Sequence, residues 1–275
     1  MGRQQGPARE TQIEMQIKKV DYTRISQCYD ETRVPLIQDT LKFCLSKISD
    51  LGKITGDSKV LDVGCGTGIY TIPLAERTNA SVVGIDSSKD MIEQAVKKED
   101  SKRIEWLIGN AEDLPFNNAR FDCVFMTMVI HQIFNKKMAI SEILRVLKGN
   151  GRFVIMTKSH GQLKRSLIMT FPKIRQIDLK RFPTIPELKN MLLSVGFRNI
   201  RYNVESAGTE RIYIRDYLAR IRKKFASTLT LLSEEDFQRG LKVFEKRLTE
   251  KWGDEKAKKT ILKEYIFVVA SQALN

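Results

Sequence analysis

The sequence lacks the features that mark membrane, secreted and zinc-dependent proteins. No window of its 275 residues approaches the roughly 18 to 20 uninterrupted apolar residues of a membrane span. The first ten residues, MGRQQGPARE, contain no apolar stretch of the kind that forms a signal peptide. Only two histidines and four cysteines occur, and no two cysteines form a C-x-x-C pair. We therefore expect a cytoplasmic protein with no disulfide framework and no bound metal, whose cysteines are buried or incidental thiols.

Positive charge is in excess, and the excess is local. The chain has 47 Lys and Arg against 33 Asp and Glu, a formal net charge of +14. Residues 145–224 hold 19 of the basic and 5 of the acidic side chains, and the rest of the chain is balanced. A basic stretch of this kind attracts phosphates, nucleic acid or an anionic membrane, but a solvated surface without a partner has the same composition. Composition alone leaves both interpretations open.

Residues 59–157 alternate between short β-rich runs and amphipathic helices. The strands are expected at 59–63, 81–85, 104–108, 121–127 and 151–156, with helices near 69–78, 88–98 and 136–147. This alternation predicts a parallel sheet with right-handed crossovers and helices on both faces.

The flanking segments are less regular. Residues 1–12 are expected to form a flexible tail, followed by helices at 13–27 and 33–50 that are joined by residues 28–30. After a basic segment, Thr184 and Glu187 have the spacing of a helix-capping box. A strand is expected at 197–204, helical structure from 212 to about 252, and a last strand at 264–270.

The run VLDVGCGTG, residues 60–68, carries most of the functional information. A hydrophobic strand enters a glycine-rich turn just before a helix, and its third glycine comes one residue earlier than in the dinucleotide fingerprint G-x-G-x-x-G. Asp62, two residues before the first glycine, would repel a pyrophosphate and attract an amine. Asp86 ends the next strand and is placed to accept hydrogen bonds from a ribose diol. The segment NAEDLPF after the third strand offers polar groups for an adenine edge.

With these motifs the chain resembles the class I S-adenosylmethionine-dependent methyltransferases, in the subgroup similar to ubiquinone/menaquinone C-methylases. The resemblance covers residues 58–158 and also includes FDCVFMTMVIH and ISEILRVLKGNGRFVI. Together with the alternation, it implies an α/β, Rossmann-like, doubly wound and mostly parallel seven-stranded sheet with helices on both faces, an N-terminal helical cap and a helical insert before the last strand. We expect one domain over 13–275: cap helices to 57, a cofactor-binding core at 58–158, and a substrate-side half at 159–275 with its insert at 212–260.

The resemblance also implies a set of site residues. S-adenosyl-L-methionine is the implied cofactor, with Asp62, Gly64 and Gly66 at its methionine part, Asp86 at the ribose and Asn110, Ala111 and Glu112 at the adenine. Thr127 would lie near the sulfonium. Cys65 and Met91 complete the expected cofactor contacts, with Tyr22 or Tyr29 of the cap closing over them.

The acceptor is less defined. The fourth strand ends in MTMVIHQ and not in the N/D-P-P-Y/F motif of methylases that act on base or amide nitrogens. His131 is the candidate catalytic base or substrate contact, and Lys158, His160 and Arg165 are further candidate substrate contacts. We expect transfer by direct displacement to a small-molecule or peptide acceptor, possibly an anionic one.

Three alternatives stay open at this point. The first is an RNA or protein methyltransferase that uses the basic surface of residues 145–224. The second, from another class, is a regulator that binds the cofactor without catalysis. The third, an NAD-dependent oxidoreductase, is disfavoured by the early third glycine and by Asp62. The sequence does not define the oligomeric state.

Overall fold

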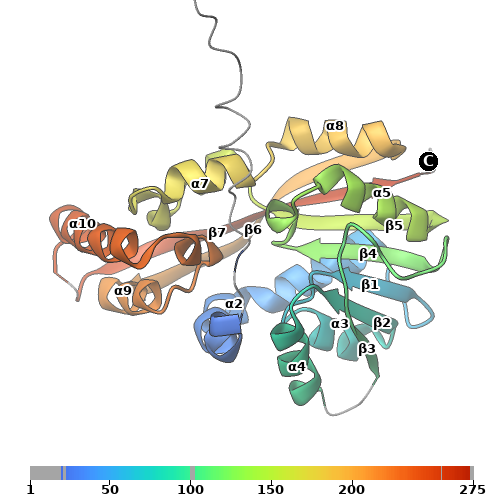
Figure 1. Cartoon of the computed structure of the whole chain (residues 1–275), viewed down its shortest axis with the longest axis horizontal. Helices are drawn as coiled ribbons and strands as arrows, with labels where there is room; N and C mark the ends of the chain where they lie inside the picture. Colours follow the sequence, from blue (N-terminus) through green and yellow to red (C-terminus); the bar gives the residue numbers. More distant parts are fainter. Residues whose placement is uncertain (1–19, 21–22, 100–102, 255, 273–275) are drawn as a thin grey trace, which may run out of the picture.

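The computed structural model describes residues 20, 23–99, 103–254 and 256–272; within helix α2 (Thr23–Gly52), the side chains of residues 23–25, 27–28 and 32–39 lie outside the description. One mixed sheet of seven strands forms its centre, in the order β3-β2-β1-β4-β5-β7-β6 (Figure 1). The strands are β1 (Lys59–Val63), β2 (Ser81–Asp86), β3 (Ile104–Ile108), β4 (Phe121–Thr127), β5 (Leu147–Thr157), β6 (Asn199–Tyr213) and β7 (Lys258–Ser271).

The first five strands are parallel, and β7 is antiparallel to both β5 and β6. The helices that cover this sheet are α2 (Thr23–Gly52), α3 (Thr71–Thr78), α4 (Lys89–Lys98), α5 (Lys136–Val146) and α8 (Ile185–Val195). The predicted Rossmann-like architecture, with its parallel core and helices on both faces, is therefore confirmed.

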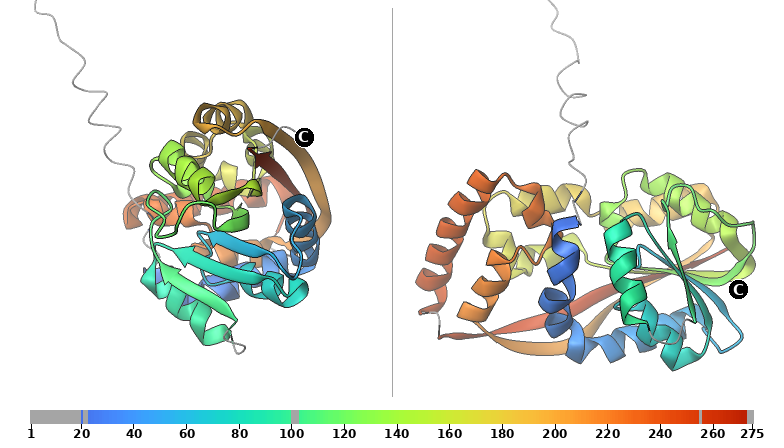
Figure 2. Two further views of the ribbon diagram at one scale, coloured as in Figure 1. Left: turned by 90° about the vertical axis from the view of Figure 1, so that its right-hand side faces the viewer. Right: turned by 60° about the horizontal axis from the view of Figure 1, so that its bottom comes forward.

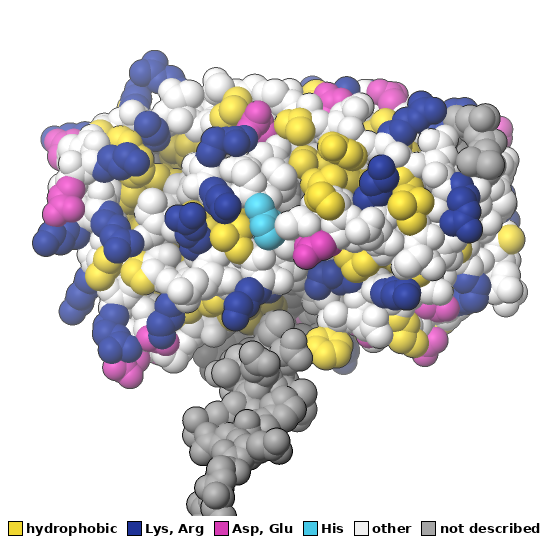
Figure 3. Space-filling view, turned by 90° about the horizontal axis from the view of Figure 1, so that it is seen from above, with side chains coloured by type: hydrophobic (Ala, Val, Ile, Leu, Met, Phe, Trp, Pro, Cys, Tyr) yellow, Lys and Arg dark blue, Asp and Glu magenta, His cyan; other side chains and the backbone are white. Residues whose placement is uncertain are grey.

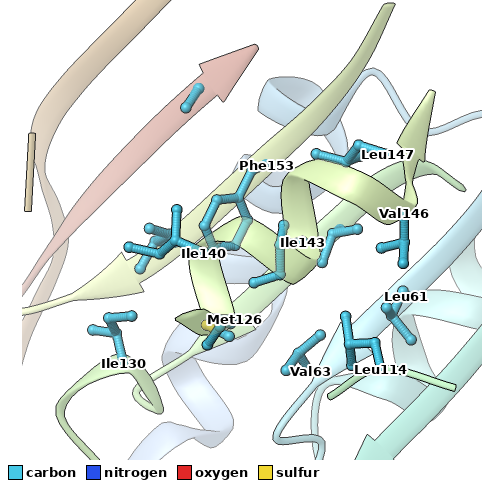
Figure 4. Packing of buried hydrophobic residues seen from close by; sticks show 14 of the residues in the cluster. Leu61, Val63, Leu114, Met126, Ile130, Ile140, Ile143, Val146, Leu147 and Phe153 are labelled. Atoms are coloured by element: carbon cyan, nitrogen blue, oxygen red, sulfur yellow. The ribbon is translucent and has the colours of Figure 1, made fainter. Parts of the chain in front are cut away.

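Side-chain alternation along the strands builds a core on each face of the sheet. Leu61 and Val63 of β1 point toward α5 and α8, where they join Ile140, Ile143 and Phe153 (Figure 4). The intervening β1 residues point to the other face, where α2 and α3 cover the sheet. Because successive side chains of a strand lie on opposite faces, a strand buried on both faces is apolar at almost every position.

The hairpin of β6 and β7 is longer than the sheet that it borders. Pairing between β5 and β7 ends at Thr157 and Ile266, whereas β6 and β7 stay paired as far as Tyr213 and Lys258. The hairpin thus continues past the carboxyl end of β5, and its far end carries α9 (Ile214–Arg222) and α10 (Glu234–Trp252), as the two further views also show (Figure 2).

A third cluster of buried side chains lies at this far end, and we call it the satellite cluster. Phe171 packs between Phe237 and Phe244 of α10, with ring centroids 5.9 and 5.4 Å away. The basic segment after β5 contributes to this cluster through three short helices, α6 (His160–Arg165), η2 (Leu167–Thr170) and α7 (Ile174–Arg181). The short helix η3 (Ser227–Leu231) completes the cluster between α9 and α10.

Several predicted boundaries are wrong in the flanking segments. The backbone is helical through residues 28–30, so α2 is continuous where two helices were expected. Strand β6 extends nine residues beyond the expected end at 204, and β7 begins at Lys258 and not at 264. The reason is cross-strand pairing: mostly polar, exposed or half-buried residues pair here across a register shift between Ser206 and Thr209, and local apolar patterning does not reveal this pairing. The predicted capping box of Thr184 and Glu187 is confirmed.

The satellite cluster generates a stability prediction. A Cβ added to Gly240 of α10 would lie 2.4 Å from Cε1 of Phe171, and that ring is almost fully buried and held by two other rings. We expect Gly240→Ala to lower the free energy of unfolding by about 1 to 2 kcal/mol, because overpacking outweighs the gain in helix propensity. Urea unfolding measures the change. Gly161→Ala is the matched control, since its Cβ would make only ordinary contacts, and an equal effect of both substitutions would contradict the packing argument.

Candidate functional site

A cavity of about 750 Å³ lies where the carboxyl ends of β1 to β4 face the satellite cluster. Its volume is within the range of small-molecule sites. The side nearest the sheet is lined by residues at or directly after the ends of the four strands, among them residues 64–67, 86–87, 109–112 and 128–129. The far side, which we call the distal compartment, is lined by residues 131–134 and by Lys136, Lys158, Leu167, Lys180, Arg181, Glu210, Tyr217, Phe225, Ile261, Leu262, Lys263 and Tyr265.

The glycine loop after β1 brings backbone to the cavity surface. Gly64, Gly66 and Gly68 all have positive φ, at 74°, 56° and 77°. A Cβ at Gly64 would lie 2.5 Å from Val129 and one at Gly68 would lie 2.7 Å from Trp106, so both glycines are required by close packing. At Gly66 no described atom lies within 4 Å of an added Cβ. The loop therefore exposes its backbone at Gly66, and a ligand can approach it closely there.

Asp86, the last residue of β2, connects this loop to the neighbouring strand. Its Oδ2 accepts a hydrogen bond from the backbone N–H of Gly66 at 2.9 Å, and its Oδ1 accepts one from the N–H of Ser88, also at 2.9 Å. The side chain also lines the cavity. Two backbone donors thus fix the carboxylate, which keeps further lone pairs for a hydroxyl-bearing ligand.

Asp62 is the one described cofactor candidate that does not line the cavity. Its carboxyl group is fully buried under α3, where Oδ2 accepts a hydrogen bond from the hydroxyl of Thr71 at 2.7 Å. No described donor bonds to its Oδ1. Burial raises the pKa of Asp62 to about 7; the Thr71 hydrogen bond opposes this rise and the charge of Asp86 adds to it. Any effect of Asp62 on a ligand therefore acts through the loop above it.

The loop after β3 is braced by its own polar side chains. Asn110, Ala111 and Glu112 line the cavity. The amide oxygen of Asn110 accepts a hydrogen bond from the N–H of Glu112 at 3.1 Å, and Oε1 of Glu112 accepts one from the N–H of Asn135 at 3.1 Å. The rigid loop presents a polar edge to the space beside Asp86.

Helix α2 closes one side of the cavity. Tyr29 lines it, whereas Tyr22 lies outside the described residues. The next residue, Asp30, accepts a hydrogen bond from the hydroxyl of Thr67 in the glycine loop and pairs with Lys98 of α4, each at 2.5 Å. Sequence reasoning missed Asp30 because it assigned residues 28–30 to a link between helices; its carboxyl group in fact ties the helix to the loop.

The remaining candidates divide into two groups. Met91, Cys65 and Thr127 line the cavity on the sheet side, and His131 and Lys158 line it in the distal compartment. The ring of His131 stacks on Phe182 with centroids 3.8 Å apart.

His160 and Arg165, expected as substrate contacts, are not among the described lining residues. His160 Nε2 forms a hydrogen bond with the carbonyl oxygen of Phe182 at 2.8 Å, and Arg165 pairs with Glu264 at 2.8 Å. Both side chains are engaged in holding the segment after β5 in place, which the sequence alone did not indicate.

Part of the basic stretch of residues 145–224 pairs with acids from the end of the chain, through Arg165, Lys173, Arg222 and Lys224. Lys173 pairs with Asp236 at 2.6 Å, and Arg222 pairs with Glu245 at 2.7 Å. On the face above α7 and α8, Lys and Arg side chains are scattered among acidic and apolar ones (Figure 3). Of the 19 basic residues of the stretch, the cavity is lined by Lys158, Lys180 and Arg181.

Comparison with known proteins agrees with this geometry. Residues 61–155 match the methyltransferase domain family. The chain is 36% identical over 220 residues to a demethylmenaquinone methyltransferase of Tropheryma whipplei, covering 72% of this chain and 90% of the relative. It is 30% identical over 198 residues to a ubiquinone/menaquinone biosynthesis C-methyltransferase of Geobacter sp., covering 63% of this chain and 83% of the relative.

The fold is also shared with a solved methyltransferase from an antibiotic biosynthesis pathway of Anabaena variabilis. The TM-score is 0.67 at 20% identity, covering 84% of this chain and 97% of the other. The chain therefore belongs to the class I S-adenosylmethionine-dependent methyltransferases. It is an enzyme of that class, and its cofactor is S-adenosylmethionine. Within the described residues, no helix is long and apolar enough to cross a membrane.

The buried carboxyl group of Asp62 predicts a pH-dependent stability. Its pKa in the folded state is above the ordinary value of 3.8, so the folded protein binds this proton more tightly than the unfolded chain does. The stabilisation that the protonated Asp62 gives the folded state is therefore at its maximum below about pH 4, and it is lost as the pH rises through about 7. The substitution Asp62→Asn removes the titrating carboxyl group, and the amide oxygen of the asparagine can still accept the hydrogen bond from the Thr71 hydroxyl. We expect the variant to gain up to about 4 kcal/mol relative to the wild type between about pH 4 and pH 8. Urea unfolding across this range measures it, and a constant difference would contradict the assignment.

Proposed function

We propose that this enzyme transfers the methyl group of S-adenosylmethionine to a small-molecule acceptor bound in the distal compartment. One observation carries the proposal: a single cavity runs from the glycine loop and Asp86 to the apolar and basic side chains of the satellite cluster. A cofactor at the strand ends and an acceptor in the distal compartment would share one space from which much of the water is excluded.

The cofactor would occupy the side of the cavity nearest the sheet. We propose that Asp86 accepts hydrogen bonds from its ribose, that the exposed backbone at Gly66 lies against its methionine part, and that Asn110, Ala111 and Glu112 bound its adenine. Met91, Cys65 and Thr127 would form the adjoining walls, and Tyr29 would close the side formed by α2. When bound, the cofactor supplies a methyl group attached to a sulfonium sulfur, which leaves as a neutral thioether and so needs no further activation. The open backbone at Gly66 and the doubly held carboxylate of Asp86 support this fit.

The protein then has to align the acceptor and keep water out. Leu167, Tyr217, Phe225 and Ile261 give the distal compartment apolar walls that suit a ring system. One relative is named as a C-methyltransferase of ubiquinone/menaquinone biosynthesis and another as a demethylmenaquinone methyltransferase. Such acceptors would suit these walls, and we propose an acceptor with an apolar ring. His131, buried against Phe182, is the proposed base or hydrogen-bonding contact for the acceptor.

The first prediction from this proposal concerns Asp86. We expect Asp86→Asn to raise the dissociation constant of S-adenosylhomocysteine by about tenfold to a hundredfold, because a charged hydrogen-bond acceptor for the ribose contributes about 1.5–3 kcal/mol. Isothermal titration calorimetry measures the change. Asp57→Asn is the matched control, since Asp57 is exposed just before the amino end of β1. Unchanged affinity in both variants would refute the assignment of Asp86.

The second prediction concerns the acceptor. The enzyme is incubated with a cell extract and a mixture of ordinary and deuterated-methyl cofactor, and the products are analysed by mass spectrometry. We expect new small-molecule products that appear as pairs offset by the mass difference between CH₃ and CD₃. Parallel extracts treated with nuclease or protease should give the same pairs. Labelling that is confined to macromolecules and lost on nuclease treatment would favour the RNA alternative instead.

A further inference from the structure

We infer that Lys136 and Arg181 form an anion-binding subsite at one end of the distal compartment, and that the enzyme selects acceptors carrying a carboxylate or phosphate group. The inference rests on the proposed function, because it names a property of the acceptor in that reaction. Two features of the compartment carry it: a buried guanidinium that is held by hydrogen bonds, and a partly buried ammonium group beside it.

Arg181 is buried and yet lines the distal compartment. It is the last residue of α7 and only 5% exposed. Its Nη1 donates a hydrogen bond to the hydroxyl of Thr228 at 2.7 Å and lies 3.6 Å from Oδ1 of Asp178. The Thr228 hydroxyl donates in turn to Asp178, so the three side chains form a closed set that fixes the guanidinium plane. A guanidinium held in one orientation at a cavity wall is preorganised for carboxylate or phosphate oxygens.

Lys136 supplies the second positive charge. It is the first residue of α5 and half-buried, and its Nζ donates a hydrogen bond to the carbonyl oxygen of Ile133 at 2.9 Å. The pKa of Lys136 is lowered, first by burial and then by the charge of Arg181, while Glu112 opposes the shift. An ammonium group that has lost water and is repelled by a second cation is stabilised when an anion comes close.

The elements that carry the two cations are packed against each other. His131, in the short helix η1 (Ile130–Gln132) just before α5, stacks on Phe182, which follows Arg181 directly. This stack holds the end of α7 beside the start of α5. The two cations therefore face one end of the compartment from neighbouring elements, and Lys180 adds a third positive group to the cavity lining.

The acidic groups around this end are already engaged. Asp178 bonds to Thr228 and pairs with Arg181. Glu112, on the cofactor side, accepts a hydrogen bond from the backbone N–H of Asn135 at 3.1 Å. Among the described residues, this end of the compartment therefore has more positive than negative charge.

Other charged side chains of the distal compartment have described partners of their own. Glu210 pairs with Lys263 at 3.1 Å and lies 3.9 Å from Arg220. Lys158 places its Nζ 5.6 Å from the centre of the Tyr265 ring, where the aromatic face stabilises a cation. Lys136 differs from these groups, because the described hydrogen bond of its ammonium group is to a neutral carbonyl oxygen. We therefore expect the anion to bind beside Lys136 and Arg181.

The test compares anionic and neutral probes of the same shape. The full-length enzyme, saturated with S-adenosylhomocysteine, is titrated by calorimetry with benzoate, phenyl phosphate and benzamide. We expect at least one of the two anions to bind about fivefold or more tightly than benzamide. The anion that binds more tightly then identifies a carboxylate or a phosphate as the preferred group. Equal affinity for all three probes would overturn the inference.

Variants locate the subsite. We expect Lys136→Met to reduce the preference for the anion to about twofold or less, because it removes one of the two charges. Lys137→Met is the matched control, since Lys137 is exposed on the same turn of α5 and is not among the described cavity-lining residues; it should keep the full preference. Lys158→Met should keep it as well. A preference that survives Lys136→Met, or that is lost in Lys158→Met alone, would overturn the inference.

Arg181→Met should abolish the preference, but it leaves Asp178 buried without its cation. Its thermal unfolding is therefore measured first, and Lys136→Met decides the outcome if the Arg181 variant does not fold. Binding of S-adenosylhomocysteine in each variant separates the two proposals. A lost anion preference with intact cofactor binding is the expected result for the subsite, whereas failure of the wild type to bind S-adenosylhomocysteine would count against the proposed function.

Discussion

The antiparallel pairing of β6 with β7 is the interaction on which the rest of the site depends. A parallel sheet with helices on both faces leaves the carboxyl ends of its strands open to water. Here the hairpin continues past β5 and carries α9 and α10, so that the satellite cluster stands opposite those ends. The cavity exists because one pair of strands is longer than its neighbours, and its far wall is therefore set by backbone hydrogen bonds more than by any one side chain.

Sequence patterns predict the parallel core well and the outer parts poorly. The strands β1, β3 and β4 begin and end where expected, because apolar runs bounded by turn residues report burial on both faces directly. The ends of β6 and β7 could not be predicted in this way. The residues at these ends are mostly polar and either exposed or half-buried, and their strand conformation comes from cross-strand partners that are distant in the sequence.

The same difference between local and long-range information applies to the site. The glycine loop and Asp86 could be predicted from the sequence, because a tight turn after β1 requires its glycines and Asp86 directly ends the next strand. Both line the cavity. The basic stretch after β5 suggested substrate contacts at His160 and Arg165, yet both hold neighbouring backbone or an acid of β7. A charge count assigns charge to a segment, but only tertiary pairing decides which charges remain for a ligand. Lys136, outside the basic stretch, was missed for that reason.

The contact of Asp30 with Thr67 and Lys98 joins helix α2 to the glycine loop of the proposed cofactor site. A ligand that orders the glycine loop also favours the arrangement in which Thr67 can donate to Asp30. By thermodynamic reciprocity, whatever docks or releases this helix changes the affinity for the ligand by the same factor. Helix α2 is thus coupled to the ligand through the glycine loop, although Asp30 itself does not line the cavity.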